Sequence, residues 1–393
     1  MSQKESPLQI IKKAYSDVIT LEADDLLSID IFIATLTACF CSRLKEPVWI
    51  YIIAPAGAGK TLVVGQARGF RKCLLLTTPT ENSWMSGYTD DDGNDPSILN
   101  LINGSVVIWK DFTALIKGPP RTTAKIFGEM RDSYDGYSSK ASGMAGVRDY
   151  VCRYGQIACV TNSIDAFSEE NQQLGERFLS FRMNRIRRTH AERVKGLDVV
   201  VDSMDGKEKW EEELRKIVHA QLERINTRAK MGNVPTVPAG AMRKMKVLAD
   251  LLALLRTVPD DMTAQDPEKA SRIIQQMLNL GKAHAMADFR DEWDSVDTGL
   301  IQRVFVDSLS AVRARLLRFL YAQGPHRPSV TVLQMMKKAM TGQKDIERIA
   351  NQYIHSGVFV EDRSQQDTSK ESWYRLSTDV YKSFREVGVF EKG

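Results

Sequence analysis

Short apolar runs that alternate with helix-like segments form the central part of the hydrophobic pattern. Runs rich in β-branched and aromatic residues are typical of buried strands. Four of them lie at residues 48–53, 72–77, 105–109 and 155–160. Helical spacing begins at Gly59 and again covers residues 120–134. Because strands and helices that alternate in this way build parallel sheets, we expect an α/β core.

Helical periodicity dominates on both sides of this core. Residues 7–44 predict two helices, and the chain becomes helical again from about residue 206. Farther on, residues 308–322 and 330–356 predict three more helices, and the segments VFVEDR and WYRLS predict two strands. Three helices followed by a β-hairpin is the order of a winged helix.

These changes of pattern divide the chain into four parts. We expect an N-terminal helical segment, an α/β core, a second helical segment and a winged-helix domain, at residues 1–46, 47–195, 196–300 and 301–393. A chain of 393 residues is long enough to give more than one of them a core.

Composition and charge narrow the class of protein only slightly. With 43% hydrophobic and 26% charged residues, the chain is typical of a soluble globular protein. Its apolar runs are too short to span a bilayer, and its N-terminus lacks a signal-peptide core. We therefore expect a cytoplasmic protein with no membrane partner. A net charge of +4 does not by itself indicate nucleic acid, and five scattered cysteines predict reduced thiols rather than a zinc site.

The segment APAGAGKT follows the first predicted strand and precedes a helix, as a phosphate-binding loop does. It fits G-x-x-x-x-G-K-[ST], except that Ala54 replaces the first glycine. In such a loop, backbone N–H groups wrap the phosphates, the lysine reaches the β- and γ-phosphates, and the threonine hydroxyl binds Mg²⁺. The predicted nucleotide-binding residues are Pro55, Ala56, Gly57, Ala58, Gly59, Lys60, Thr61 and Leu62. The alternative is a glycine-rich turn.

Three further polar residues lie at or near the ends of predicted strands. Hydrolysis requires a carboxylate near the metal, and Asp111 is predicted to hold Mg²⁺ with Thr61 or to polarise the attacking water. Lys110 stands where a second acid is usual, so the alternative is a surface Lys-Asp pair. Asn162 is predicted to orient water against the γ-phosphate. Arg177 precedes another apolar strand, with a surface ion pair as its alternative.

This ordered set of residues resembles the AAA+ ATPases, and among them the minichromosome-maintenance-like helicases of phages and mobile elements. The resemblance covers about residues 24–260. Its most specific parts are the phosphate loop and the segments VVIWKDFT, FGEMRDSYDGYSSKASG, IACVTNSID and LGERFLSFRM. It implies an α/β P-loop core with a parallel sheet, a helical lid at 196–300 and a C-terminal winged helix.

The resemblance also implies roles for two arginines. Arg177 matches the arginine finger that reaches a neighbour's γ-phosphate, and Arg243 falls where this family has the sensor 2 arginine of its lid. Both are therefore expected to be catalytic, together with Asp111 and Asn162. A finger supplied by a neighbour implies an oligomer, and the resemblance suggests a ring of six.

Two regions are expected to touch DNA. In the resembling helicases a β-hairpin projects into the central channel, and residues 134–155 have a glycine-rich centre that suits it. Its predicted phosphate contacts are Lys140, Arg148 and Arg153. Those of the winged helix are Lys344, Arg348, Arg363 and Lys370. The alternatives are a solvated loop and a winged helix that docks on a neighbouring subunit.

The sequence therefore predicts an ATP-driven DNA motor, with replicative helicase or replication initiator of a phage or mobile element as its expected role. ATP and Mg²⁺ are the expected cofactors, and single-stranded or forked DNA, further copies of the chain and other replication proteins are the expected partners. Two alternatives stay open. One is a helicase loader or protein remodeller. The other is a nucleotide-gated DNA-binding assembly with slow hydrolysis, which Lys110 favours.

Overall fold

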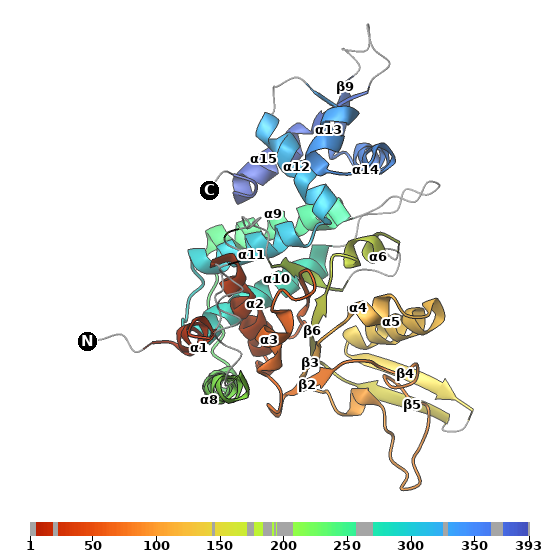
Figure 1. Ribbon diagram of the computed structural model, residues 1–393, viewed down its shortest axis with the longest axis vertical. Helices are drawn as coiled ribbons and strands as arrows, with labels where there is room; N and C mark the ends of the chain where they lie inside the picture. The colour runs from red at the N-terminus through yellow and green to blue at the C-terminus, as the bar shows by residue number, and fades with distance from the viewer. Residues whose placement is uncertain are drawn as a thin grey trace.

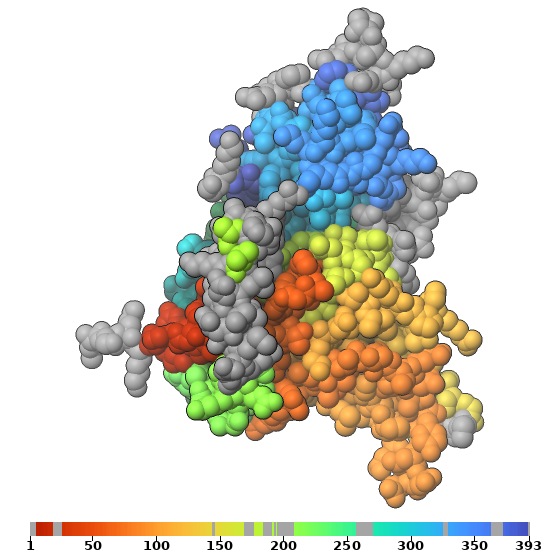
Figure 2. Space-filling model, in the orientation of Figure 1, coloured from red at the N-terminus to blue at the C-terminus, as the bar shows by residue number. Residues whose placement is uncertain are grey.

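A computed structural model describes most of the chain (Figure 1). The described residues are 5–18, 23–143, 146–170, 177–183, 191, 194, 207–256, 270–324, 329–362 and 372–391. They form a mixed α/β structure around a five-stranded parallel sheet. In Figure 2 the C-terminal residues (blue) form one end of the molecule, and the segment after β2 (Cys73–Leu76), drawn in orange, forms the other.

The sheet has the strand order β2-β3-β6-β1-β7. Its strands are β1 (Trp49–Ile53), β2 (Cys73–Leu76), β3 (Val106–Trp109), β6 (Gly155–Val160) and β7 (Leu179–Arg182). All neighbouring pairs are parallel. The four predicted strands are thus confirmed within two residues at each end, and β7 is the apolar strand expected after Arg177.

The side chains of the sheet alternate between two hydrophobic clusters because successive residues of a strand point to opposite faces. Along β1, Ile50 and Ile52 belong to one cluster, and Trp49, Tyr51 and Ile53 to the other. Every residue of β1, β3 and β6 is buried. Strands covered on both faces read as continuous apolar runs, which is why the sequence revealed them.

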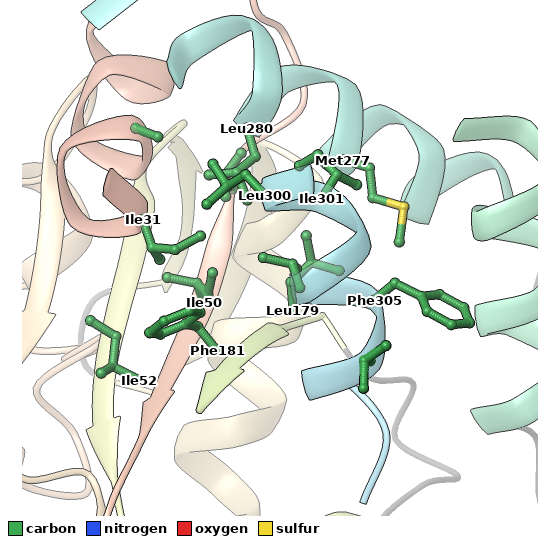
Figure 3. Close-up of a cluster of buried hydrophobic side chains, with 14 of the residues drawn as sticks. Ile31, Ile50, Ile52, Leu179, Phe181, Met277, Leu280, Leu300, Ile301 and Phe305 are labelled. Atoms are coloured by element: carbon green, nitrogen blue, oxygen red, sulfur yellow. The ribbon is translucent and has the colours of Figure 1, made fainter. Parts of the chain in front are cut away.

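Helices cover the face that carries Ile50 and Ile52. They are α1 (Pro7–Ser16), α2 (Ala23–Phe40), α3 (Lys60–Gly65), α8 (Lys207–Met231), α9 (Ala239–Arg256), α10 (Ala270–Ala287) and α11 (Ser295–Asp307). Figure 3 shows α2, α10 and α11 contributing Ile31, Leu280 and Ile301 to this cluster. Because α2 is buried along most of its length, its threonines bond back to backbone carbonyls, as Thr35 does to Ile31 O at 2.8 Å.

The opposite face is covered by a shorter set of elements. They are η1 (Ile98–Asn100), α4 (Thr113–Ile116), α5 (Pro120–Tyr134) and α6 (Ile164–Glu170). Strands β4 (Tyr137–Ser142) and β5 (Gly146–Val151) pair as an antiparallel hairpin, which confirms the expected hairpin. It lies beside α5 and extends away from the helices of the other face (Figure 1).

The C-terminal residues add a smaller unit with its own sheet. Its elements are α12 (Ala311–Gln323), β8 (Val330–Thr331), α13 (Val332–Ala339), α14 (Gln343–His355), β9 (Phe359–Asp362), β10 (Trp373–Leu376) and α15 (Thr378–Val387). The three expected helices and two expected strands are present, and β8 completes an antiparallel sheet of order β8-β10-β9. The sequence analysis missed β8 and α15.

The boundary expected between residues 300 and 301 falls inside α11, which packs against β7 and α10. Arg313 and Tyr353 of the C-terminal unit both donate hydrogen bonds to Leu255 O at the end of α9. The hydrophobic core therefore continues into the C-terminal unit. Among the described residues, no helix has the length and apolar character needed to cross a membrane.

Candidate functional site

The carboxyl edge of the sheet gathers three of the predicted site residues. In a parallel sheet all strands end at the same edge, and β6 lies between β1 and β3. Lys60 follows β1, Asp111 follows β3, and Asn162 follows β6. The edge of the sheet thus carries a lysine, a carboxylate and an amide from three neighbouring strands.

The predicted phosphate loop at this edge has a backbone that requires glycine at two positions. Gly57 has a φ of 77° and Gly59 a φ of 84°, a region that other residues seldom adopt. A Cβ atom added to either glycine would meet nothing within 4 Å, so the loop borders open space. Ala54 is buried in the core, and its N–H donates to Val160 O at 3.1 Å. The methyl group of Ala54 is therefore part of the core and does not enter the loop.

Several donors of this loop face no acceptor in the described part of the chain. The described residues offer no hydrogen-bond acceptor to the N–H groups of Gly57, Gly59, Lys60 and Thr61. The ammonium of Lys60 donates to Ala54 O at 2.6 Å and Pro55 O at 2.8 Å. Partial burial lowers the pKa of Lys60, against the opposing influence of Cys159 and Asp111. A group of unpaired N–H donors next to a lysine suits an anion with several oxygens.

Asp111 is exposed, and within the described ranges one of its carboxylate oxygens accepts a hydrogen bond. Its Oδ1 accepts from the N–H of Thr113 at 3.0 Å. Thr113 Oγ1 in turn accepts from the N–H of Thr161 at 3.1 Å, and Thr161 Oγ1 lies 2.8 Å from the hydroxyl of Ser163. These hydroxyl contacts join the ends of β3 and β6, so Asp111 and the exposed Asn162 keep a fixed relation.

Mg²⁺ fits this edge in combination with phosphate oxygens. Thr61 is exposed at the start of α3, and Asp111 leaves one carboxylate oxygen without a recorded donor among the described residues. Protein-only metal sites need more ligands, and no group of three or more His, Cys, Asp or Glu side chains that could hold a metal occurs in the part described. Mg²⁺ commonly takes one or two protein ligands and completes its shell with phosphates and water. The oxygens of Thr61 and Asp111 fit this kind of Mg²⁺ site.

Arg177 lies at the opposite edge of the sheet. Leu179, two residues later, pairs with Ile50, and the ring of Phe178 lies 5.2 Å from that of Trp49. Arg177 is therefore level with the amino end of β1. The length of β1, about 16 Å at ~3.3 Å per residue, separates it from the phosphate loop. Within one chain, Arg177 and Lys60 do not share a site.

A second arginine accompanies Arg177 at this amino edge. The guanidinium carbons of Arg177 and Arg272 lie 5.6 Å and 5.4 Å from the centre of the Tyr134 ring. Gln276 donates to Arg177 O at 2.8 Å and ties the arginine to α10. Two guanidinium groups on one ring form a cationic pair. The sequence analysis missed Arg272 because only the fold brings α10 to Tyr134.

Arg243 is placed less distinctively. It is exposed near the start of α9, and within the described ranges no hydrogen bond or ion pair joins it to the phosphate loop. Its sensor 2 role stays a prediction.

The cations of the β4–β5 hairpin point toward the protein. Lys140 Nζ lies 3.0 Å from Glu129 Oε1 and also donates to Met85 O. Arg148 pairs with Asp95 at 3.2 Å and also donates to Tyr88 O. These two cations therefore lie against α5 and the segment between β2 and η1.

The outward face of the hairpin has a different character. It carries the exposed side chains of Tyr137, Ser139, Ala141, Val147, Asp149 and Val151. Among the described hairpin residues, this face has no lysine or arginine. DNA contact through Lys140 and Arg148 stays a prediction that their internal contacts do not support.

Arg153, the third predicted hairpin cation, closes the end of α2. Its guanidinium donates to Ala38 O and Cys39 O, both at 3.2 Å, and to Leu44 O and Lys45 O. The last carbonyls of a helix have no intrahelical donor, and an arginine there satisfies them. The location expected for Arg153 in the hairpin is therefore wrong.

The predicted contacts of the C-terminal unit are more open. Lys344 and Arg348 lie one turn apart on α14, and both are exposed. Arg363 and Lys370 lie outside the described residues.

No protein-family model matches the chain, and no curated protein does so either. The features that bear on function are therefore the two edges of the sheet and the surfaces around them.

Proposed function

We propose that the chain is an oligomeric ATPase of the AAA+ type that binds ATP at the carboxyl edge of its sheet. The helices α8–α11 would be the lid, and the C-terminal unit would be a winged helix. The observation that carries the proposal is the loop with two left-handed glycines, N–H groups that find no acceptor among the described residues, and Lys60, flanked by Asp111. These are the features that cradle a nucleotide's phosphates.

The opposite placement of Arg177 supports an oligomer. Phosphoryl transfer is accelerated when an arginine stabilises charge on the γ-phosphate. In this chain, Arg177 and Arg272 lie about one strand length from the loop, so a complete site needs the amino edge of a second copy. Head-to-tail contacts of this kind close into rings, and the family resemblance suggests six members.

Each residue then has a stated task. The loop N–H groups and Lys60 hold the β- and γ-phosphates, and Thr61 and Asp111 hold Mg²⁺, which supplies neutralisation of phosphate charge. Asn162 orients the attacking water. Arg177 and Arg272 of a neighbouring copy stabilise the charge that develops on the γ-phosphate, an effect worth ~10³-fold or more for an arginine finger.

DNA is the proposed object of the motor, as in a replicative helicase or initiator of a phage or mobile element. The exposed Lys344 and Arg348 on α14 support contact with a polyanion. A helicase loader or protein remodeller is the second candidate. It is favoured by the hairpin, whose described cations pair with Glu129 and Asp95 inside the chain.

The test is ATP turnover with and without single-stranded and forked DNA. We expect turnover that DNA stimulates, and we expect Arg177→Ala and Lys60→Ala each to reduce it to background. Mixing the two variants should restore part of it, because one interface in the mixture combines an intact Lys60 with an intact Arg177.

Other outcomes redirect the proposal. Turnover that ignores DNA would favour the loader or remodeller. ATP-driven assembly without turnover would favour the nucleotide-gated DNA-binding assembly. Failure of the mixed variants to regain activity would argue against a site shared between copies.

A further inference from the structure

A group of half-buried and buried ionic contacts joins the carboxyl edge of the sheet to the C-terminal unit. Arg182 is the last residue of β7, and it pairs with Ile53, the last residue of β1 before the phosphate loop. Its guanidinium donates to Asp165 Oδ1 at 2.5 Å and to Leu309 O at 3.1 Å. Its backbone N–H donates to Asp307 Oδ2 at 3.0 Å. The end of β7 is thus held both by α6 and by the end of α11.

Asp165 makes a second contact across the same boundary. Its other carboxylate oxygen accepts from the N–H of Ala311 at 3.2 Å. Ala311 is the first residue of α12, where N–H groups lack intrahelical partners and a carboxylate is favoured by the helix dipole. Asp165 therefore caps α12 from a distant part of the sequence, while its own N–H donates to Asn162 O at 3.2 Å.

We propose that Asp165 is a positioning residue that makes the segment carrying Asn162 and the start of α12 move as one unit. The hydroxyl contacts of Thr113 and Thr161 continue this unit to Asp111. Any displacement of the carboxyl edge by a ligand is then passed to α12 and the C-terminal unit. This coupling of the carboxyl edge to α12 depends on the proposed function only for the identity of the ligand.

One substitution cuts the link at the first residue of α12. Ala311→Pro removes the N–H that Asp165 accepts, and the first position of a helix tolerates proline. Ser310, the residue before it, has a φ of −59° and a ψ of 150°, which is the conformation that a following proline requires. Because the proline Cδ takes the place of the N–H proton, the Asp165 carboxylate also has to turn away from α12.

Hydrogen exchange measures the link directly and needs no nucleotide. Ala311→Pro should speed exchange of the amides of α6 about tenfold, while the amides of β1 exchange as in the parent chain. Unchanged exchange in α6 would overturn the proposal. In the parent, Mg²⁺ with a non-hydrolysable ATP analogue should slow exchange in α12, and Ala311→Pro should abolish that effect with analogue affinity unchanged within about twofold. Persistence of the effect in the variant would also overturn it.

Turnover gives an independent measure of positioning. Asp165→Asn should lower kcat about tenfold and leave the KM for ATP unchanged, because the phosphate loop is untouched, and Asp165→Glu should recover part of the loss. Asp149→Asn on the outward hairpin face removes a carboxylate of equal size and should leave both values at the parent level. A rise in KM without a fall in kcat would contradict the positioning role.

The failure of the proposed function would look different. A parent chain that binds no ATP analogue would refute the nucleotide site, yet the exchange of α6 in Ala311→Pro would still decide whether Asp165 couples the two elements.

Discussion

The two edges of the parallel sheet use their polar residues in opposite ways. At the carboxyl edge, Thr61 and Asp111 are exposed, and the loop around Lys60 keeps N–H groups for which the described residues offer no acceptor. At the amino edge, Arg153 closes the end of α2, and Arg177 lies against Tyr134. One edge leaves donors open for a ligand, and the other holds its cations in place with aromatic and helix-end contacts.

This difference teaches where each edge can act. Donors that have no protein partner gain most from an incoming anion, because a polar group that is removed from water without a partner costs free energy. Cations that are already oriented lose little entropy when a phosphate reaches them. The carboxyl edge therefore suits binding, and the amino edge suits recognition of a ligand that a second copy holds.

Lys60→Ala tests the carboxyl edge and should have the largest effect. Removing the ammonium leaves the phosphate charge without its nearest cation, so we expect turnover to fall by roughly 10³-fold or more and affinity for a fluorescent ATP analogue to fall with it. Lys117→Ala, an exposed lysine beyond α4, is the matched control and should bind as the parent does. Unaltered analogue binding by Lys60→Ala would mean that the carboxyl edge is not the nucleotide site.

Much of the carboxyl edge could be predicted because its determinants are local. The loop's glycines, the strands before Lys60 and Asp111, and the position of Asn162 all follow from contiguous apolar runs and a short motif. Parallel pairing then brings the strand ends together without any further information. The Lys110 departure has no evident structural consequence: its N–H simply donates to Leu76 O at 3.1 Å.

The amino edge could not be predicted in the same way. Arg272 reaches Tyr134 only because α10 packs along α2, and Arg153 turns to α2 because the carbonyls there need donors. The expected hairpin and the positive charges marked Lys140 and Arg153 as candidates for DNA, but a sequence does not say on which side of a strand the partners lie. A local sequence pattern cannot predict the role of a residue that depends on elements distant in the sequence.

Arg153→Ala tests whether this arginine serves the fold. The substitution leaves several carbonyl groups at the end of α2 without donors, so we expect a loss of roughly 2–4 kcal/mol in the free energy of unfolding, measured by urea titration. The salt dependence of DNA binding should keep its slope. Arg131→Ala is the control: among the described residues its side chain forms an ion pair with Asp132 alone, at 3.7 Å, and its loss should cost less than about 0.5 kcal/mol. A stable Arg153→Ala chain with a shallower salt slope would return Arg153 to the DNA interface.

A buried histidine connects three of the helices that cover one face of the sheet. His284 of α10 lies 2.6 Å from Asp297 Oδ1 of α11 and 3.8 Å from Asp30 Oδ1 of α2. Burial acts to lower the pKa of His284, but the hydrogen bond with Asp297 and the negative charge of the nearby Asp30 outweigh it and raise the pKa from 6.5 to about 9. Burial acts to raise the pKa of Asp297, but hydrogen bonds from Arg290 and His284 lower it to about 2.

These shifts predict the pH dependence of stability. A histidine whose pKa is raised on folding contributes fully below about 6.5 and loses that contribution as the pH rises through 9. Asp297 contributes above 3.8 and loses its contribution as the pH falls toward 2. We expect stability to be highest between about pH 4 and 6.5 and to fall by on the order of 2 kcal/mol toward pH 9. The urea midpoint measured against pH checks this, and His284→Gln should flatten the alkaline fall. A parent curve without that fall would mean that His284 is neutral in the folded chain.

Arg272→Ala should have the smallest effect on turnover and is the sharpest test of the comparison. Arg272 and Arg177 lie on one ring, so losing Arg272 leaves one cation in place, and we expect kcat to fall about tenfold, against roughly 10³-fold for Arg177→Ala. Neither variant should weaken binding of an ATP analogue to isolated chains, because in one copy both arginines lie at the edge away from the loop. Arg272→Lys keeps the charge but loses the planar group that lies on the ring, so its kcat should fall between those of the parent and Arg272→Ala. A loss of analogue affinity in isolated Arg272→Ala chains would mean that both edges belong to one site within a single chain, and it would contradict the separate roles given to them here.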